Sequence, residues 1–246
     1  MNEIRIIPVE GIPEIKVDDN LAEITFDVLN KSEIGIEKND IFIVTQKIVS
    51  KSEGMERDLS NYDFEELLQS QSKKIIRKRG DLVIAKTHHG FICANAGIDK
   101  SNVRNNTALL LPEDPNKSAY KFQKRFESLA NLPIAVIISD TFGRAWRKGQ
   151  VNFAIGSSGI SPIDSYIGKL DSFDNELNAT EIAVIDELAS AAELVMKKTI
   201  DVPIAIIRGV DYKSSKLNAN ELIREDNEDF FPVSYTHLRA HETCGH

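Results

Sequence analysis

One stretch of the sequence reads Ile134-Ala-Val-Ile-Ile-Ser-Asp-Thr-Phe-Gly-Arg-Ala-Trp-Arg-Lys-Gly-Gln150. Its apolar start, rich in β-branched isoleucine, predicts a buried strand. We expect that strand to end at Asp140 and Thr141, whose hard oxygen atoms suit Mg²⁺ or Mn²⁺. The cations that follow suit phosphate or carboxylate oxygens, and they are Arg144, Arg147 and Lys148. The stretch therefore predicts either a strand end that carries chemistry or a buried strand followed by a solvated basic turn.

The segments around this stretch alternate irregularly between strand and helix patterns. Strands are predicted over residues 3–9, 40–51, 151–160 and 202–208, with a hairpin over 82–94. Helices are predicted over residues 19–30, 63–79, 118–132 and 178–198. Because strands and helices are intermixed without a regular βα repeat, the prediction is an α+β fold of mixed β-sheets with packed helices, not a doubly wound sheet.

Length and charge narrow the function classes. The chain has 246 residues, with 30 Lys+Arg against 38 Asp+Glu and a formal net charge of −8. This balance argues against a nucleic-acid binder and favours small-molecule partners. No apolar run approaches a membrane span and no signal-peptide pattern opens the chain, so we expect a cytoplasmic protein. Two cysteines cannot form a disulfide framework.

The last residues form a distinct segment. His237 and His241 have the i, i+4 spacing of a metal site, close to Cys244. The segment 233–246 nevertheless lacks helical or strand periodicity and resembles translated sequencing-adapter sequence. We therefore expect a non-native, disordered tail after a domain that covers residues 1–232, as one unit or two subdomains, and we expect truncation after Pro232 to preserve activity.

Polar side chains also gather where two other segments end. Gln46, Lys47 and Lys51 bring donors together at the end of the predicted 40–51 strand, which suits phosphate or nucleotide binding, although a solvent-facing strand explains the same alternation. Asp99 lies in a turn after the hairpin and could pair with Asp140 at a divalent metal ion; an Asx turn is the alternative. His88 and His89 at the hairpin tip face opposite ways and are not expected to be ligands together.

Five motifs in sequence order resemble the coenzyme F420-0:L-glutamate ligase family. They are Ile7-Pro-Val-Glu-Gly-Ile-Pro13, Thr45-Gln-Lys-Ile-Val-Ser-Lys-Ser-Glu-Gly54, Asn95-Ala-Gly-Ile-Asp-Lys-Ser-Asn102, Ser139-Asp-Thr-Phe-Gly-Arg-Ala-Trp-Arg-Lys-Gly-Gln150 and Pro203-Ile-Ala-Ile-Ile-Arg-Gly209. The resemblance implies that GTP and a divalent metal ion, Mn²⁺ or Mg²⁺, drive addition of L-glutamate to F420-0, followed by a further glutamate through a γ-glutamyl bond. It also implies K⁺ as an activator, and a homodimer with the site at the edge of the subunit.

The resemblance also implies roles for single residues. Metal binding falls on Asp99, Asp140 and Thr141. Nucleotide contacts fall on Glu10, Gly11, Ile12, Pro13, Gln46, Lys47, Lys51, Asn102, Met196 and Pro203. The segment 196–203 lacks the glycines usual in the family, and Lys198 stands where a second-metal ligand is expected, although an ammonium cannot ligate a metal.

The chemistry implied by the resemblance is activation of a carboxylate as an acyl phosphate. Metal-binding residues would neutralise the transferred phosphoryl group, and Asp140, Arg144 and Arg147 are the predicted catalytic residues. Two alternatives share the same residues. One is a metal-dependent nucleotide phosphohydrolase, and the other is a non-catalytic ligand-binding homologue, which the residues at 196–203 favour.

Overall fold

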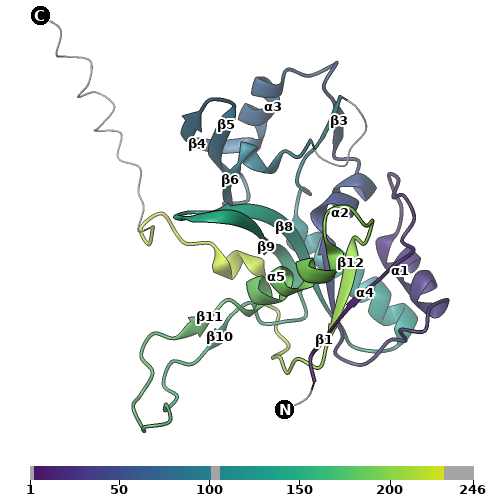
Figure 1. The fold of residues 1–246 in the computed structure, drawn as a ribbon, viewed down its shortest axis with the longest axis vertical. Coiled ribbons are helices and arrows are strands. Elements are labelled where there is room, and N and C mark those ends of the chain that lie inside the picture. The colour runs from purple at the N-terminus through teal and green to yellow at the C-terminus, as the bar shows by residue number, and fades with distance from the viewer. Residues whose placement is uncertain (1–2, 101–105, 230–246) are drawn as a thin grey trace, which may run out of the picture.

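A computed structural model describes residues 3–100 and 106–229, and its centre is a five-stranded mixed sheet (Figure 1). In spatial order the strands are β1 (Arg5–Pro8), β12 (Ile204–Arg208), β2 (Ile41–Thr45), β8 (Ala135–Arg144) and β9 (Arg147–Ser158). Only β2 and β8 are parallel neighbours, and the other adjacent pairs of this sheet are antiparallel. Helices cover both faces, which confirms the predicted α+β class.

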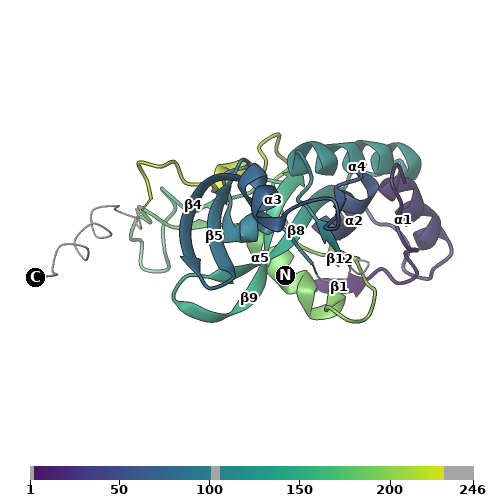
Figure 2. The same ribbon diagram turned by 90° about the horizontal axis from the view of Figure 1, so that it is seen from above.

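Both faces of the sheet are buried, because its central strands are apolar at nearly every position. Phe42 and Ile138 face a layer formed by α1 (Leu21–Asn30) and α4 (Pro115–Ala130). Ile43 and Ile137 face α5 (Val184–Met196) on the other side. Figure 2 shows α1 and α4 on one side of the sheet and α5 on the other. Such two-sided burial produces the continuous apolar runs seen in the sequence.

A β-bulge interrupts the pairing of β8 with β9. Ile138 lies opposite Gly156, whereas Ser139 lies opposite Ala154, so Ile155 is an extra residue on β9. The side chain of Asp186 on α5 accepts a hydrogen bond from the Ala154 backbone N–H at 2.8 Å. The bulge therefore leaves no unpaired donor at Ala154 and fixes β9 against α5.

A small module packs above the β8–β9 hairpin in Figure 1. Its sheet contains β4 (Ser72–Arg79), β5 (Leu82–Thr87) and β6 (Ile92–Ala94), and α3 (Phe64–Gln71) and the 3-10 helix η1 (Asn95–Gly97) complete it. A separate core built on Leu68, Val83 and Ala85 stabilises it. The short strands β3 (Glu56–Asp58) and β7 (Thr107–Leu109) form a separate antiparallel pair. The predicted 82–94 hairpin is confirmed.

The prediction of one long strand over residues 40–51 is wrong in its second half. The strand ends at Thr45, which has extended backbone angles, and the helix α2 (Gln46–Ser52) follows at once. Ile48 and Val49 favour strands as residue types. In the folded protein both are buried against the α1–α4 layer, and packing overrides that propensity.

Two predicted helix boundaries are also wrong. The 63–79 helix ends at Gln71, and the basic run that follows is the edge strand β4, joined to β5 by a turn with Gly80 at φ 59°. Lysine-rich edge strands resist edge-to-edge association, so the basic run is explained without a helix dipole. The last helix begins at Val184 after an Ala183 N-cap, because Glu181 instead pairs with Ser165 in a ladder.

Two further features lie outside the sheet. The strands β10 (Asp164–Ser165) and β11 (Glu181–Ile182) form the base of an arm that projects from the body in Figure 1. The 3-10 helix η2 (Ala219–Leu222) follows β12. The predicted tail, 233–246, lies outside the described residues. Within residues 3–100 and 106–229, no helix combines the length and apolar character needed to cross a bilayer.

Candidate functional site

A cavity of about 320 Å³ lies at the carboxyl end of β2, beside residues 139–141 in the middle of its parallel neighbour β8. We call it the β2–β8 cavity. Five segments line it, namely residues 12–15, 45–48 with Lys51, 139–141 with Asn152, 197–198 and 201–203. Ligands commonly bind in a crevice at the carboxyl end of a strand in an open sheet, and β2 provides such an end here. The fold therefore gathers segments from distant parts of the sequence into one depression.

The cavity brings together most of the predicted site residues. Those that line it are Ile12, Pro13, Gln46, Lys47, Lys51, Asp140, Thr141 and Pro203. Glu10 and Gly11 form the turn just before residue 12, with Gly11 at φ 84°. The side chain of Met196 is instead buried in the core beneath α5. Asn102 lies outside the described residues.

Asp140 has an unusual electrostatic environment. Loss of hydration by burial raises the pKa of its carboxyl to about 7, and the charge of Asp99 acts in the same direction. A hydrogen bond from the Thr141 backbone and the charges of Lys47 and Lys198 oppose this rise in pKa. Nearby positive charge thus offsets the cost of burying Asp140 only in part.

Asp99 comes from the small module and reaches the same region. The turn before it has Ala96 at φ 52° and Gly97 at φ 75°. A Cβ on Gly97 would lie 2.6 Å from Leu111 Cδ1, so glycine allows this close packing. The carboxylate oxygen Oδ2 of Asp99 lies 3.0 Å from Lys47 Nζ on α2. One ion pair therefore connects the small module to the β2–β8 cavity.

Four side chains form a closed polar ring around Thr141. The Thr141 hydroxyl donates to Asn152 Oδ1 at 2.7 Å, and Asn152 Nδ2 donates to Glu193 Oε2 at 2.9 Å. Lys198 Nζ lies 3.0 Å from Glu193 Oε1 and donates to Thr141 Oγ1 at 2.7 Å. The ring gives Lys198 two partners in the fold, and its ammonium contacts the same hydroxyl that was predicted to bind metal. Asn152 and Glu193 were not found from the sequence, because neither lies in a motif with Thr141.

The oxygen ligands at the cavity could supply part of the coordination shell of one divalent cation. Within the described residues, no group of three or more His, Cys, Asp or Glu side chains could hold a metal. Mg²⁺ and Mn²⁺ are often bound by one or two carboxylates completed by phosphate and water oxygens, which Asp99 and Asp140 suit. Ser139 Oγ and Gln46 Nε2 at the cavity are buried without a hydrogen-bond partner in the described protein. Such atoms are typical of a site that binds a polar ligand.

The remaining predicted cations occupy two different settings. Lys51 lines the cavity and pairs with Glu14, with Nζ and Oε1 2.7 Å apart. Arg144 and Arg147 instead lie at the tip of the β8–β9 hairpin, where Arg144 Nη2 donates to the Lys148 carbonyl at 2.8 Å. The strand β8 thus runs past Asp140 to Arg144, which corrects the expectation that it stops at the carboxylate. The tip arginines do not line the cavity.

The two histidines of the 82–94 hairpin contact backbone carbonyls. His88 Nε2 lies 3.1 Å from the Ser70 carbonyl oxygen. His89 Nε2 lies 2.9 Å from the carbonyl of Pro112 and stacks on Phe91. These contacts fix the hairpin to neighbouring segments.

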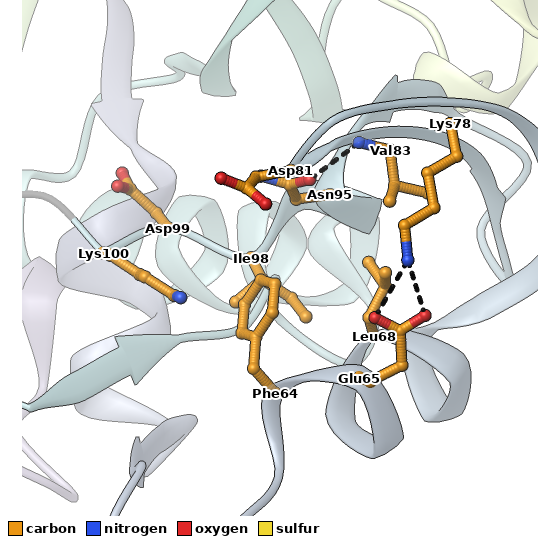
Figure 3. Close-up of a pocket in the computed structure, with 10 residues that line it drawn as sticks. All are labelled: Phe64, Glu65, Leu68, Lys78, Asp81, Val83, Asn95, Ile98, Asp99 and Lys100. Atoms are coloured by element: carbon orange, nitrogen blue, oxygen red, sulfur yellow. Dashed lines mark hydrogen bonds and ion pairs between the residues drawn. The ribbon is translucent and has the colours of Figure 1, made fainter.

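A second cavity, of about 770 Å³, lies within the small module (Figure 3). Phe64 and Leu68 are among its apolar walls, and the Lys78–Glu65 ion pair lies on the side opposite Asp99. Lys100 Nζ lies 3.5 Å from the centre of the Phe64 ring. Asp99 thus borders this cavity while its carboxylate pairs with a lysine of the β2–β8 cavity.

Comparison with known proteins identifies the family. The family model for F420-0:gamma-glutamyl ligase matches residues 11–209. A protein of Methanothermobacter thermautotrophicus named coenzyme F420:L-glutamate ligase is 39% identical over 224 residues, 84% of this chain and 89% of its own length. Proteins with the same name from Archaeoglobus fulgidus and Methanocaldococcus jannaschii are 34% and 37% identical, covering 92% and 80% of this chain and 95% and 86% of their own lengths. The chain therefore belongs to the F420-0:gamma-glutamyl ligase family.

Proposed function

We propose that this protein joins L-glutamate to coenzyme F420-0 in a reaction driven by GTP and a divalent metal ion, Mn²⁺ or Mg²⁺. Family membership and the names of the relatives support F420 and glutamate as substrates. One observation supports the GTP and metal parts of the proposal. The β2–β8 cavity combines Asp140 with Lys47 and Lys51, and Lys47 is ion-paired to Asp99. Carboxylates for a metal beside ammonium groups for phosphates suit phosphoryl transfer.

The reaction must first activate a carboxylate, because an amine does not displace an oxide from carbon. A carboxylate oxygen of F420-0 attacks the γ-phosphorus of GTP, the bond from that phosphorus to the bridging oxygen breaks, and GDP leaves. The α-amine of glutamate then forms a bond to the acyl carbon of the resulting acyl phosphate. The acyl C–O bond breaks, phosphate leaves with its electron pair, and the nitrogen loses a proton. A further round would add glutamate through a γ-glutamyl bond.

The residues of the cavity suit the binding steps. Asp99 and Asp140 would hold the divalent ion, which when bound supplies charge neutralisation to the phosphoryl group. Lys51 would bind a phosphate oxygen as a point charge, and the loop 12–13 would contact the nucleotide. Arg144 and Arg147 would bind a carboxylate or phosphate of F420-0 through bidentate hydrogen bonds from the hairpin tip. K⁺ activation and a homodimer belong to the same proposal.

Mass spectrometry of F420-0 incubated with glutamate, GTP and Mn²⁺ tests the proposal. We expect products heavier by one and then two glutamyl residues, with one GDP formed for each glutamate added. Omission of glutamate, GTP or Mn²⁺ should each abolish the mass increase. GTP hydrolysis that needs neither F420-0 nor glutamate would instead identify a phosphohydrolase. Nucleotide binding without turnover would identify a ligand-binding homologue.

A further inference from the structure

Two residues that serve different ligands in the proposed function are bonded to each other. Asp99 would bind the divalent ion and Lys47 would bind the nucleotide, yet Lys47 Nζ lies 3.0 Å from Asp99 Oδ2. The two groups belong to separate parts of the fold, since Lys47 is on α2 and Asp99 follows η1 in the small module. Each ligand must therefore compete with this ion pair for its own binding residue.

The ion pair can open readily. The side chains of Lys47 and Asp99 are 23% and 25% exposed, so water can solvate both when they separate. Opening the pair therefore does not leave either charge buried away from water. Because Lys47 is in the first turn of α2 and lines the β2–β8 cavity, its ammonium can turn to a phosphate oxygen in that cavity by side-chain rotation.

The Lys47 ammonium and a divalent ion would repel each other if both bound the Asp99 carboxylate. A metal bonded to this carboxylate at about 2.1 Å would lie within about 5 Å of an ammonium that contacts the same group. Two cations at that separation repel strongly in a partly buried site. A phosphate that accepts the ammonium removes this repulsion and leaves the carboxylate for the metal.

We propose that Lys47 exchanges Asp99 for a nucleotide phosphate, and that this exchange makes nucleotide binding and divalent-metal binding favour each other. The inference rests on the proposed function. Lys47 is therefore a positioning residue. Until a nucleotide binds, its ammonium occupies the Asp99 carboxylate and weakens divalent-metal binding there. By linkage, the metal must favour the nucleotide by the same factor.

Lys51 provides a matched control within the same cavity. Its Nζ pairs with Glu14 Oε1 at 2.7 Å, and Glu14 is largely exposed and is not a proposed metal ligand. Removal of Lys51 therefore deletes one positive charge from the β2–β8 cavity without releasing Asp99. A comparison of the two lysines separates the exchange from a general change in charge.

The experiment measures Mn²⁺ affinity by electron paramagnetic resonance, with and without saturating GDP. Without GDP, Lys47→Met should bind Mn²⁺ at least about tenfold tighter than the wild type, equivalent to about 1.4 kcal/mol. Lys51→Met should stay within about threefold of the wild type. The factor by which GDP tightens Mn²⁺ binding should be at least about fivefold smaller in Lys47→Met than in the wild type.

The reciprocal variant tests the other partner. Asp99→Asn removes the Asp99 carboxylate as a competitor for Lys47 without adding metal, so the GDP affinity of this variant in the presence of a chelator should be at least about fivefold higher than that of the wild type. Lys47→Arg keeps the charge and should retain the coupling. Should Lys47→Met unfold, Lys47→Gln replaces it, with thermal unfolding as the check on both.

The outcomes distinguish this inference from the proposed function. Equal nucleotide-free Mn²⁺ affinities for Lys47→Met and Lys51→Met would overturn the exchange. Unchanged GDP affinity in Asp99→Asn would do the same. A wild-type protein that binds no Mn²⁺ even with GDP would instead remove the metal part of the proposed function.

Discussion

Each end of the central sheet carries an aspartate with restricted access to water. The aspartate at one end is fully hydrogen-bonded to an arginine, and the aspartate at the other end is not. At one end Asp40, which is 0% exposed, accepts hydrogen bonds from Arg208 Nε and Nη2, both at 2.7 Å. Glu37 accepts a further hydrogen bond from Arg208 at 2.6 Å. At the other end Asp140 has burial that raises its pKa to about 7. One end satisfies its charges within the protein, while at the other nearby lysines offset the burial of the carboxyl only in part.

We expect this difference to separate stability from function along two neighbouring strands. Asp40 precedes β2 and Asp140 lies on β8, which runs parallel to β2. Hydrogen bonding to Asp40 raises the pKa of Arg208 further above its usual range, so this guanidinium stays charged. We expect substitutions at the Asp40 end to affect unfolding and substitutions at the Asp140 end to affect turnover.

The largest expected effect is on turnover at the Asp140 end. Asp140→Asn keeps the shape of the side chain but removes the charge that would hold a divalent ion. Glutamate addition should fall at least about 1,000-fold, equivalent to about 4 kcal/mol, with an unchanged circular dichroism spectrum. Asp164→Asn in the projecting arm should retain wild-type turnover. Near-normal turnover by Asp140→Asn would end the assignment of a metal to this carboxylate.

The second effect is on unfolding at the Asp40 end. Asp40→Ala leaves the Arg208 guanidinium buried without its main partner, so the free energy of unfolding should fall by about 3–5 kcal/mol. Urea denaturation measures this loss. Glu37→Gln, whose carboxylate is 56% exposed, should lower it by about 0–1 kcal/mol. Equal losses in the two variants would show that the buried pair is not what stabilises this end.

The third prediction concerns pH and the metal-free protein. The folded-state pKa of Asp140, about 7, exceeds its ordinary value, so the folded protein binds this proton more tightly than the unfolded chain. The resulting stability is complete below about pH 4 and is lost as the pH rises through about 7. In a chelator, Asp140→Asn should therefore gain stability relative to the wild type between pH 4 and pH 8, by up to about 4 kcal/mol. Parallel pH profiles of urea unfolding for the two proteins would contradict this.

The smallest effect is expected in the polar ring. Asn152→Ala removes the acceptor of the Thr141 hydroxyl and the donor to Glu193, and it should cost about 1–3 kcal/mol of unfolding free energy. Asn175→Ala in the exposed arm also loses side-chain hydrogen bonds, yet it should change stability by less than about 0.5 kcal/mol. A ring that is only incidental would give equal values for the two variants.

The sequence predicted those parts of the fold that depend on local pattern. The apolar runs of β2, β8 and β12 were recognisable because burial on both faces removes polar residues from them. The start of α2 at Gln46 was missed, because its β-branched residues are selected by packing and not by helix propensity.

Residues of the candidate site could be named from the sequence where they stand in motifs. Asp140 and Lys47 do so, and both line the cavity. Asn152 and Glu193 stand in no motif. The position of Asn152 depends on the bulge. Simple alternation along β9 from Ser158 would place Asn152 on the face of the sheet that points away from α5. Only the paired strands show which side chain lies opposite Thr141.

The bulge also governs which changes in chain length the site can tolerate. Ile155 is spare in the pairing, so its deletion would leave Asn152 opposite Thr141 and would sacrifice only apolar packing beneath α4. Residues gained or lost at the hairpin tip would likewise leave that pair in place. A single residue inserted between Asn152 and Ala154 could not be accommodated in the same way. It would turn Asn152 away from α5 or require a second bulge. Length variation is therefore permitted on both sides of the polar ring and excluded within it.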